Sequence, residues 1–322
     1  MYRLRLLMRR LAPAIMQRIE QAEYAEQWVY PIPSGQSEYY RTDRRLRMEG
    51  ITLNIEEQIA TLQKWRSDAQ HRDLHDAIRN DPTINVPTSW GNFLGRGVIQ
   101  NGFYPSPDAE IYASMIREFR PAQIIEVGSG FSTLIARRAI AHAGLQTKII
   151  VVDPEPRTSV AHAADRIVTS LVEHSGLLGR VDWSLPTLLF IDSSHVCRAR
   201  GDLPYLYCDL IPSLPPGVLV HVHDIFLPFD YPTNYDRYLY TEQFLLHCLL
   251  AHSPRYHVVL SAQILSRDHL DEIQATFGPA VGEKPIFAGA SFWFRIKRLF
   301  PEVAYDPKNP RQDAGGKGAE SN

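Results

Sequence analysis

The amino-acid sequence predicts an α/β fold of the doubly wound kind, a mostly parallel sheet with helices on both faces. From residue 123 onward, short apolar runs of strand length alternate with helical patterns, as is typical of βαβ units. The first of these runs, residues 123–127, ends in a Gly-x-Gly turn that leads directly into a helical pattern. In doubly wound sheets, this strand–turn–helix geometry lets a ligand approach the backbone closely.

Each element is predicted from an apolar run and from the residues that begin or end it. Mostly apolar runs such as residues 123–127, with Ile124, Ile125 and Val127, and residues 187–191 indicate strands that are buried in a parallel sheet. Asp108 begins a helix, and the turn at 215–217 precedes another strand. The predicted helices are residues 108–119, 131–143 and 240–251, and the predicted strands are residues 123–127, 147–152, 187–191, 218–222, 256–261 and 291–296.

Four segments of the chain differ in composition. Residues 1–80 predict a polar, helical N-terminal extension. Residues 81–107 are rich in Pro, Gly and Asn and also carry aromatic residues, which predicts an ordered loop that is a candidate lid. Residues 108–298 are predicted to form the sheet domain, and residues 299–322, with almost no large apolar residues, a disordered tail.

Composition and charge indicate which partners and cellular locations are not expected for this protein. A net charge of −2 gives no bulk attraction to nucleic acid. No apolar run reaches the ~18 residues of a membrane-spanning helix. Arginines interrupt the apolar residues at the N-terminus, so a secretory signal is not expected. The three cysteines show no Cys-x-x-Cys spacing, which predicts reduced, buried thiols and a cytoplasmic protein.

The glycine turn indicates which kind of ligand approaches it. The segment is Glu126-Val-Gly-Ser-Gly-Phe-Ser-Thr133. A dinucleotide fingerprint has a third glycine where this chain has Thr133, so a dinucleotide is disfavoured. Glu126 lies two residues before Gly128 and offers a carboxylate to an ammonium or hydroxyl group of a ligand held over the turn.

Polar side chains follow the ends of four predicted strands, and the carboxyl ends of parallel strands share the edge where ligands bind. A carboxylate such as Asp153 can accept hydrogen bonds from both hydroxyls of a ribose, with Glu155 as the nearby competitor. Taken singly, each such carboxylate is also explained as a helix cap. The four groups are Glu126 to Gly130, Asp153 with Glu155, Asp192 with His195, and His223 with Asp224.

Two of these groups, Asp192 with His195 and His223 with Asp224, predict a place for a metal ion and a base beside the ligand at the glycine turn. If the strands that precede them are neighbours, ~4.8 Å apart, then Asp192, His223 and Asp224 would reach one divalent ion. His195 would then stay free as a base, near its ordinary pKa of ~6.5.

At these motifs the chain is similar to class I S-adenosylmethionine-dependent methyltransferases. More narrowly, it resembles the branch called methyltransferase domain 24, which is related to metal-dependent sugar O-methyltransferases and to cephalosporin-hydroxylase-type proteins. The resemblance covers about residues 100–297, including the Thr241-Glu242-Gln243 helix start. The motifs that carry it are Glu126-Val-Gly-Ser-Gly-Phe-Ser-Thr133, Asp153-Pro-Glu155, Ile191-Asp-Ser-Ser-His195 and His223-Asp-Ile-Phe-Leu-Pro228.

The resemblance implies a Rossmann-like, seven-stranded sheet whose last strand is antiparallel, with S-adenosylmethionine over the glycine turn. In metal-dependent relatives, the position of Asp192 and an acidic pair after the next strand hold Mg²⁺, and the histidine three residues after that Asp is the base. His195 and Asp224 match, but His223 stands where those relatives have a carboxylate, which leaves the metal open. The implied donor-binding residues are Glu126, Gly128, Ser129, Gly130, Ser132, Thr133, Asp153 and Glu155.

The predicted function is therefore O-methylation of a sugar or another small hydroxylated molecule. His195 would take the proton of the acceptor hydroxyl, a divalent ion would lower the pKa of that hydroxyl, and Tyr104 would contact the acceptor. Two alternatives are an NAD-dependent oxidoreductase, which Thr133 disfavours, and a non-catalytic relative that binds S-adenosylmethionine. The sequence leaves the oligomeric state open, with residues 1–80 as a candidate dimer surface.

Overall fold

The computed structural model describes residues 44–86, 99–232, 235, 238–278 and 289–298, together with Ala12 and Ile15. The chain divides into two compact units. One comprises Met1–Arg45 with Asp230–Tyr240, and the other Leu46–Phe229 with Thr241–Asn322. The arginine-rich N-terminal segment, Trp90 and Phe93 of the predicted lid, and the predicted tail lie outside the described residues.

In the described part of the smaller unit, Arg44 and Asp230 form an ion pair with N and O atoms 3.4 Å apart, and the Asp230 amide donates to the Arg44 carbonyl. Tyr231, Tyr235 and Tyr240 pack their rings together, with centroids 5.5–6.2 Å apart. Packing of this kind is a favourable contact between aromatic rings.

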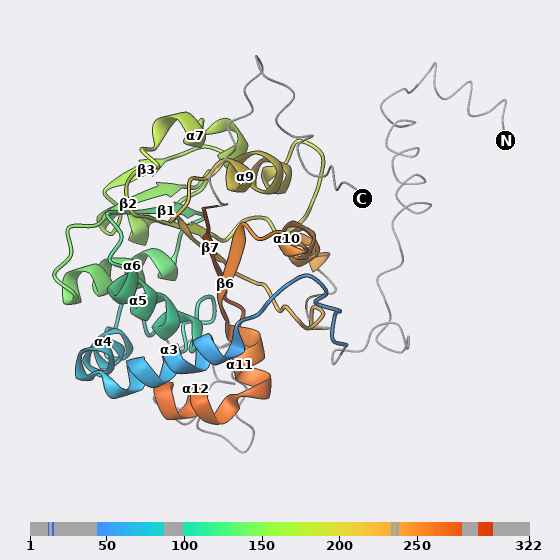
Figure 1. Cartoon of the computed structure of the whole chain (residues 1–322). Helices are drawn as coiled ribbons and strands as arrows, with labels where there is room; N and C mark the ends of the chain where they lie inside the picture. Colours follow the sequence, from blue (N-terminus) through green and yellow to red (C-terminus); the bar gives the residue numbers. More distant parts are fainter. Residues whose placement is uncertain are drawn as a thin grey trace, which may run out of the picture. The chain divides into compact units, whose positions relative to one another are not determined.

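The larger unit is built on a seven-stranded sheet with the order β3-β2-β1-β4-β5-β7-β6 (Figure 1). β7 pairs antiparallel with both of its neighbours, and the other pairs are parallel. The predicted sheet with an antiparallel last strand is therefore confirmed. The strands are β1 Gln123–Val127, β2 Lys148–Val152, β3 Arg166–Val168, β4 Thr187–Ile191, β5 Leu219–Val222, β6 Tyr256–Ser261 and β7 Phe292–Ile296.

The register of the central strands brings their carboxyl ends level with one another. Val127, the last residue of β1, pairs with Val152 of β2 and with Ile191 of β4. Ile191 in turn pairs with Val222, the last residue of β5. The residues that directly follow these four strands therefore lie side by side along one edge of the sheet.

Helices cover both faces of the sheet because every central strand is apolar on both sides. Ile124 and Phe190 face one buried cluster, which includes side chains of α3 to α6 and α12, while Ile125 and Leu189 face another, with α8 to α10. The helices are α3 Ile55–Ser67, α4 Ala69–Arg79, α5 Asp108–Phe119, α6 Phe131–His142, α7 Leu177–Arg180, α8 Asp202–Pro204, α9 Ile211–Ser213, α10 Glu242–Leu250, α11 Ala262–Asp268 and α12 Leu270–Phe277, with short 3₁₀ segments η2 Thr158–His162 and η3 Val172–His174 and the π-helical segment η4 Tyr205–Leu210.

α3 and α4 are packed into the core of this unit. Leu62, Trp65, Leu74 and Ile78 are fully buried and belong to the same apolar cluster as the sheet residue Ile124. The compact unit thus begins at Leu46, whereas the change in composition along the sequence lies near residue 80.

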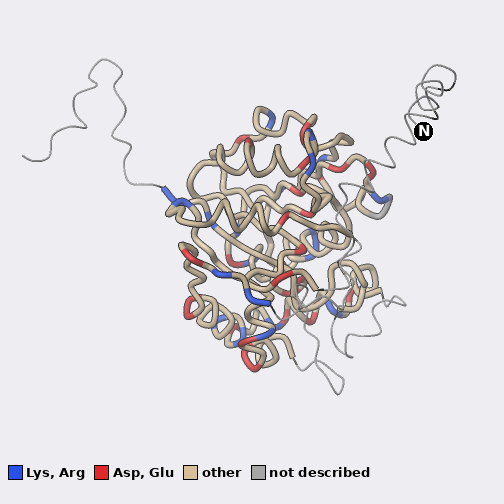
Figure 2. Tube along the Cα trace, turned by 90° about the vertical axis from the view of Figure 1, so that its right-hand side faces the viewer, with Lys and Arg blue, Asp and Glu red and all other residues tan. Residues whose placement is uncertain are grey.

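The surface of the described part carries mixed charge. In Figure 2, basic and acidic residues are interspersed along the trace, and neither sign gathers on the side in view. No helix in this part is long and apolar enough to cross a membrane. All three cysteines are free, and they are exposed rather than buried as predicted. Cys248 is exposed because it lies on the outer side of α10, whereas Leu246, two residues earlier, lies on the inner side and is fully buried.

Candidate active site

The Gly-x-Gly turn after β1 is wedged between the ends of its two neighbouring strands. The Gly128 amide donates to the carbonyl of Val152, at 3.0 Å. Gly128 has φ +81°, and a Cβ at this position would lie 2.2 Å from the carbonyl oxygen of Asp192. Both the left-handed conformation and the close approach require glycine.

Thr133 connects the turn to the strand beneath it. Its hydroxyl accepts a hydrogen bond from the Gly130 amide, at 3.2 Å, and donates to Oε2 of Glu126, at 2.5 Å. A Cβ at Gly130, in contrast to Gly128, would meet no atom within 4 Å. Thr133, which stands at the third glycine position of the dinucleotide pattern, thus links the turn to Glu126 by hydrogen bonds.

Glu126 is a fully buried carboxylate at the end of β1. Burial raises its pKa to about 8, although its hydrogen bond from Thr133 opposes this shift. The second oxygen, Oε1, is buried without a hydrogen-bond partner among the described residues. An unpaired buried oxygen costs free energy, so this atom is suited to a donor group supplied by a ligand.

A cavity of about 480 Å³ opens at this edge of the sheet. Of the residues predicted from the sequence, Gly128, Ser129, Asp153, Glu155 and Asp192 line it. Glu126, Ser132 and Thr133 are buried and are not part of its lining. The lining residues that the sequence did not predict are Val127, Val152, Pro154, Arg157, Leu171, Val172, Glu173, Ser193, Ser194, Arg198 and Asp202.

Asp153 is held in a fixed orientation at the end of β2. Its Oδ2 accepts from the Ser129 hydroxyl at 2.5 Å, and its Oδ1 accepts from the Glu155 amide at 2.8 Å. Glu155 is exposed and contributes its backbone to this contact. Leu171 also lines this cavity, with an apolar side chain that is 48% exposed. Its segment follows β3, a strand that the sequence analysis missed.

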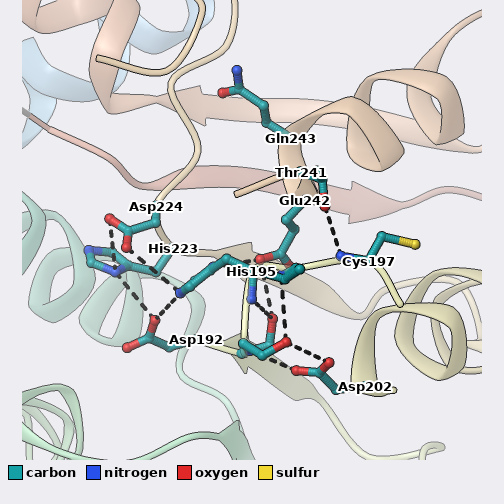
Figure 3. A network of polar contacts seen from close by, with 12 residues as sticks. Asp192, His195, Cys197, Asp202, His223, Asp224, Thr241, Glu242 and Gln243 are labelled. Carbon is teal, nitrogen blue, oxygen red and sulfur yellow. Dashed lines mark hydrogen bonds and ion pairs between the residues drawn. The ribbon is translucent and has the colours of Figure 1, made fainter. Parts of the chain in front are cut away.

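His195 lies among three carboxylates beyond β4 (Figure 3). Its Nδ1 is 2.7 Å from Oε2 of Glu242, and its Nε2 is 3.1 Å from Oδ1 of Asp192 and 3.7 Å from Oδ2 of Asp224. Burial would lower the pKa of His195, but the hydrogen bonds to Asp192 and Glu242 and the charges of Glu242 and Asp224 raise it to about 10. The predicted pKa near 6.5 is therefore wrong.

His223 lies on the other side of Asp192. Its Nδ1 is 3.6 Å from Oδ1 of Asp192 and 3.9 Å from Oδ1 of Asp224, and its Nε2 is 3.7 Å from Oδ2 of Asp108. Burial would lower the pKa of His223, but the charge of Asp224 and the contacts with Asp108 and Asp192 hold it well above its usual range. Burial likewise acts to raise the pKa of Asp192, but the two histidines hold it well below its usual range.

The structure thus brings the predicted metal ligands together, but it pairs them with one another. The described His, Cys, Asp and Glu side chains form no group of three or more that could hold a metal ion. Asp192 and Asp224 form ion pairs with His195 and His223 at N–O distances of 3.1–3.9 Å. In this arrangement Asp192, His223 and Asp224 face one another rather than a shared metal position, so they do not fit a metal.

Tyr104, the predicted acceptor contact, is 2% exposed. Its ring centroid lies 4.7 Å from that of His223 and 5.7 Å from that of Phe190. In this structure the Tyr104 ring packs against His223, and a contact with the acceptor stays a prediction.

Glu242 is the residue of this cluster that the sequence analysis did not assign. It is fully buried at the start of α10 and contacts His195 across 47 positions of sequence. The available signal was the pair Glu242-Gln243, which begins an otherwise mostly apolar helix. Two adjacent polar residues in such a helix indicate buried hydrogen bonds.

Comparison with known proteins finds a family model that matches part of the sheet. The model of a family described as a methyltransferase domain matches residues 125–225. This segment runs from β1 to just beyond β5, so it includes the glycine turn, Asp153, Asp192, His195 and His223-Asp224. Over this segment, the predicted resemblance to a methyltransferase domain is confirmed.

Individual relatives match over different lengths. An uncharacterized protein of Archaeoglobus fulgidus is 33% identical over 112 residues, which make up 33% of this chain and 46% of the relative. The chain therefore spans less than half of that relative. The Podospora anserina methyltransferase PaMTH1, bound to S-adenosylhomocysteine, is 14% identical, with 77% of this chain and 98% of that chain covered and a TM-score of 0.38. The MycE methyltransferase of the mycinamycin pathway, in complex with Mg and S-adenosylhomocysteine, is 16% identical, with 65% and 55% covered and a TM-score of 0.33.

Proposed function

We propose, from the premise that residues 125–225 form a methyltransferase domain, that this chain transfers a methyl group from S-adenosylmethionine to a hydroxyl of a small molecule. One observation carries the proposal. A single cavity is lined by the glycine turn, by Asp153 and by Asp192, whose side chain is hydrogen-bonded to His195. Donor-binding and proton-accepting groups therefore adjoin one another.

The residues present fit the donor. The unpaired Oε1 of Glu126 suits the ammonium of its amino-acid end, and the open space above Gly130 leaves room for the ligand. Asp153 offers carboxylate oxygens to the ribose, and Leu171 offers an apolar surface to the adenine. When bound, S-adenosylmethionine supplies a methyl group on a positively charged sulfur.

On the acceptor side, His195 is the proposed proton acceptor. The hydroxyl oxygen forms the new bond to the methyl carbon as the carbon–sulfur bond breaks and its electron pair returns to sulfur. The hydroxyl proton passes to Nε2 of His195, in the fraction of molecules in which that nitrogen is unprotonated. Because such a displacement is in line, orientation of the hydroxyl supplies much of the rate. A sugar or other polyhydroxylated molecule is the proposed acceptor class.

Isothermal titration with S-adenosylmethionine and S-adenosylhomocysteine tests the donor half. We expect both to bind, and we expect Asp153→Ala to weaken binding at least about tenfold, since it removes hydrogen bonds to a charged group. Glu49→Ala is the control, because Glu49 is an exposed carboxylate that does not line the cavity. Folded protein that binds neither compound, or that binds NAD instead, would overturn the proposal.

Transfer of a labelled methyl group to pools of sugars and other hydroxylated small molecules tests the acceptor half. We expect label in at least one pool, and loss of that label with His195→Gln. Binding of the donor without transfer to any pool would favour the alternative of a non-catalytic relative.

A further inference from the structure

The first turn of α10 carries two polar residues that are fully buried, Glu242 and Gln243. The remainder of this helix is mostly apolar, and Leu246 and Leu250 belong to the core. Removing a carboxylate from water is unfavourable unless hydrogen bonds replace the lost hydration. The position of Glu242 therefore calls for specific partners.

The two carboxylate oxygens of Glu242 have such partners. Oε2 lies 2.7 Å from Nδ1 of His195 and accepts from the Ser193 hydroxyl at 3.2 Å. Oε1 accepts from the Tyr207 hydroxyl at 3.0 Å. Figure 3 shows Glu242 reaching from α10 toward His195, on the side of the imidazole that faces away from Asp192. Ser193 and Tyr207 fix the carboxylate, and the carboxylate fixes the ring.

The backbone of the same turn holds the loop that carries His195. The amides of Thr241 and Glu242 both donate to the His195 carbonyl, at 2.8 and 3.2 Å. The Thr241 hydroxyl accepts from the Cys197 amide at 2.7 Å. His195 has φ +60°, which is uncommon for a residue other than glycine, and these bonds account for its retention.

Gln243 attaches the neighbouring loop to the same helical turn. Its Oε1 accepts from the Phe226 amide at 3.1 Å, and its Nε2 donates to the Phe229 carbonyl at 3.4 Å. This segment directly follows His223 and Asp224. One turn of α10 thus sets the position of the loops after β4 and β5 relative to each other.

We infer that Glu242 is a positioning residue for the proposed methyl transfer, whose buried carboxylate keeps a proton on Nδ1 of His195 and turns Nε2 toward Asp192 and the acceptor hydroxyl. The reason is the chemistry of the pair, since an ionised carboxylate only accepts hydrogen bonds and a neutral imidazole carries one N–H. Asp192 makes the same demand on Nε2, but across 3.1 Å and from a side chain that is 39% exposed, whereas Glu242 is fully buried and only 2.7 Å from Nδ1. Glu242 therefore selects the tautomer with hydrogen on Nδ1, as the carboxylate does in Ser-His-Asp triads. This inference rests on the proposed function.

Glu242→Gln and Glu242→Ala test the inference against wild type. We expect each to lower kcat by about 100-fold or more, with KM for the acceptor changed less than about threefold, because orientation of a base is lost rather than substrate contact. Affinity for S-adenosylhomocysteine should stay within about twofold of wild type. Gln58→Ala is the matched control, since Gln58 is another fully buried polar side chain, bonded to Leu53 and Ser261 of the core. It should lower the melting temperature but not kcat.

A second measurement reads the tautomer without activity or variants of Glu242. In ¹H–¹⁵N spectra of the wild-type imidazoles recorded above pH 10, where His195 is neutral and carries one proton, we expect an N–H signal at Nδ1 of His195 that His195→Gln removes. Absence of this signal, or a kcat of Glu242→Gln equal to that of wild type, would overturn the role of Glu242. Failure of wild type to bind S-adenosylhomocysteine would instead overturn the proposed function, so the two failures are distinguishable.

Discussion

Glu126 affects both the stability of the protein and the binding of its proposed ligand. A buried carboxyl with a pKa of about 8 keeps its proton in the folded state, whereas the unfolded chain loses that proton near pH 4.5. The folded state therefore binds more protons between these values, and its stability falls as the pH rises from 4.5 through 8.

Glu126→Gln removes this pH dependence, because glutamine does not ionise yet still accepts the Thr133 hydrogen bond. We expect its melting temperature to match that of wild type at pH 5 and to exceed it by about 2–5 °C at pH 9. Thermal denaturation across pH 5–9 measures the difference, with the exposed Glu155→Gln as the control. A difference between Glu126→Gln and wild type that does not change with pH would contradict this assignment.

The two glycines of the turn have different tasks, and alanine separates them. Gly128→Ala forces a Cβ to within 2.2 Å of the Asp192 carbonyl, at φ +81°, so we expect a loss of about 1–3 kcal/mol in stability together with weak donor binding. Gly130→Ala meets no protein atom, so it should keep the melting temperature but reduce donor affinity by occupying the ligand's space. Calorimetry and titration of both variants check this, and equal melting temperatures would show that the Gly128 contact is unimportant.

His195 gives the proposed reaction a defined pH dependence. With its pKa at about 10, only a small fraction of the imidazole is unprotonated at neutral pH. If Nε2 is the proton acceptor, kcat should rise about tenfold per pH unit from pH 7 and level off near pH 10. A pH–rate profile checks this, and a rate independent of pH over that range would exclude His195 as the base.

At the scale of elements, α4 contains two buried histidines that make its packing sensitive to acid. Burial lowers the pKa of His75 to about 3, with further lowering by the charges of Arg79 and His71, and burial lowers that of His71 to about 4. The unfolded chain binds these protons near pH 6.5, so stability is complete above that pH and falls below it, by about 2 kcal/mol per histidine at pH 5.

His75→Gln should keep a side chain able to bond the Ser114 hydroxyl, which lies 2.8 Å from His75 Nε2, but it cannot titrate. We expect the drop in melting temperature from pH 7 to pH 5 to be smaller in this variant than in wild type. The exposed His174→Gln, measured in parallel, should behave as wild type. An unchanged acid sensitivity in His75→Gln would contradict the assignment.

Elements with strong local patterns could be predicted, and those without them could not. β1, β4 and α5 were predicted with their observed bounds because both strands are short and mostly apolar and Asp108 marks the helix start. β3 has three residues, none fully buried, so it offers no pattern. The same holds at the site. Asp192 and His195 follow a recognisable strand, whereas the contact of His195 with Glu242 depends on tertiary packing between residues that are distant in sequence.

At the scale of the whole molecule, α3 and α4 are integral to the larger unit, and this has a measurable consequence. Trp65 is fully buried in the same cluster as Ile124 of the sheet. We expect Trp65→Ala to cost about 3–5 kcal/mol and to shift the main calorimetric transition as a whole. Gln70→Ala, which removes an exposed side chain on α4, should leave the temperature of this transition unchanged. A separate minor transition that alone responds to Trp65→Ala would show that these helices fold independently of the sheet.

The carboxyl ends of β1, β2, β4 and β5 are aligned, and this alignment determines which insertions and deletions the fold tolerates during evolution. Side chains alternate between the two faces of a strand, so losing or gaining one residue within β4 would turn Asp192 to the opposite face and move it away from Asp153 and His223. Substitutions along the same strands change packing but keep this alignment. We therefore expect homologous proteins to differ in length in the loops that follow the central strands, whereas the lengths of β1, β2, β4 and β5 stay constant.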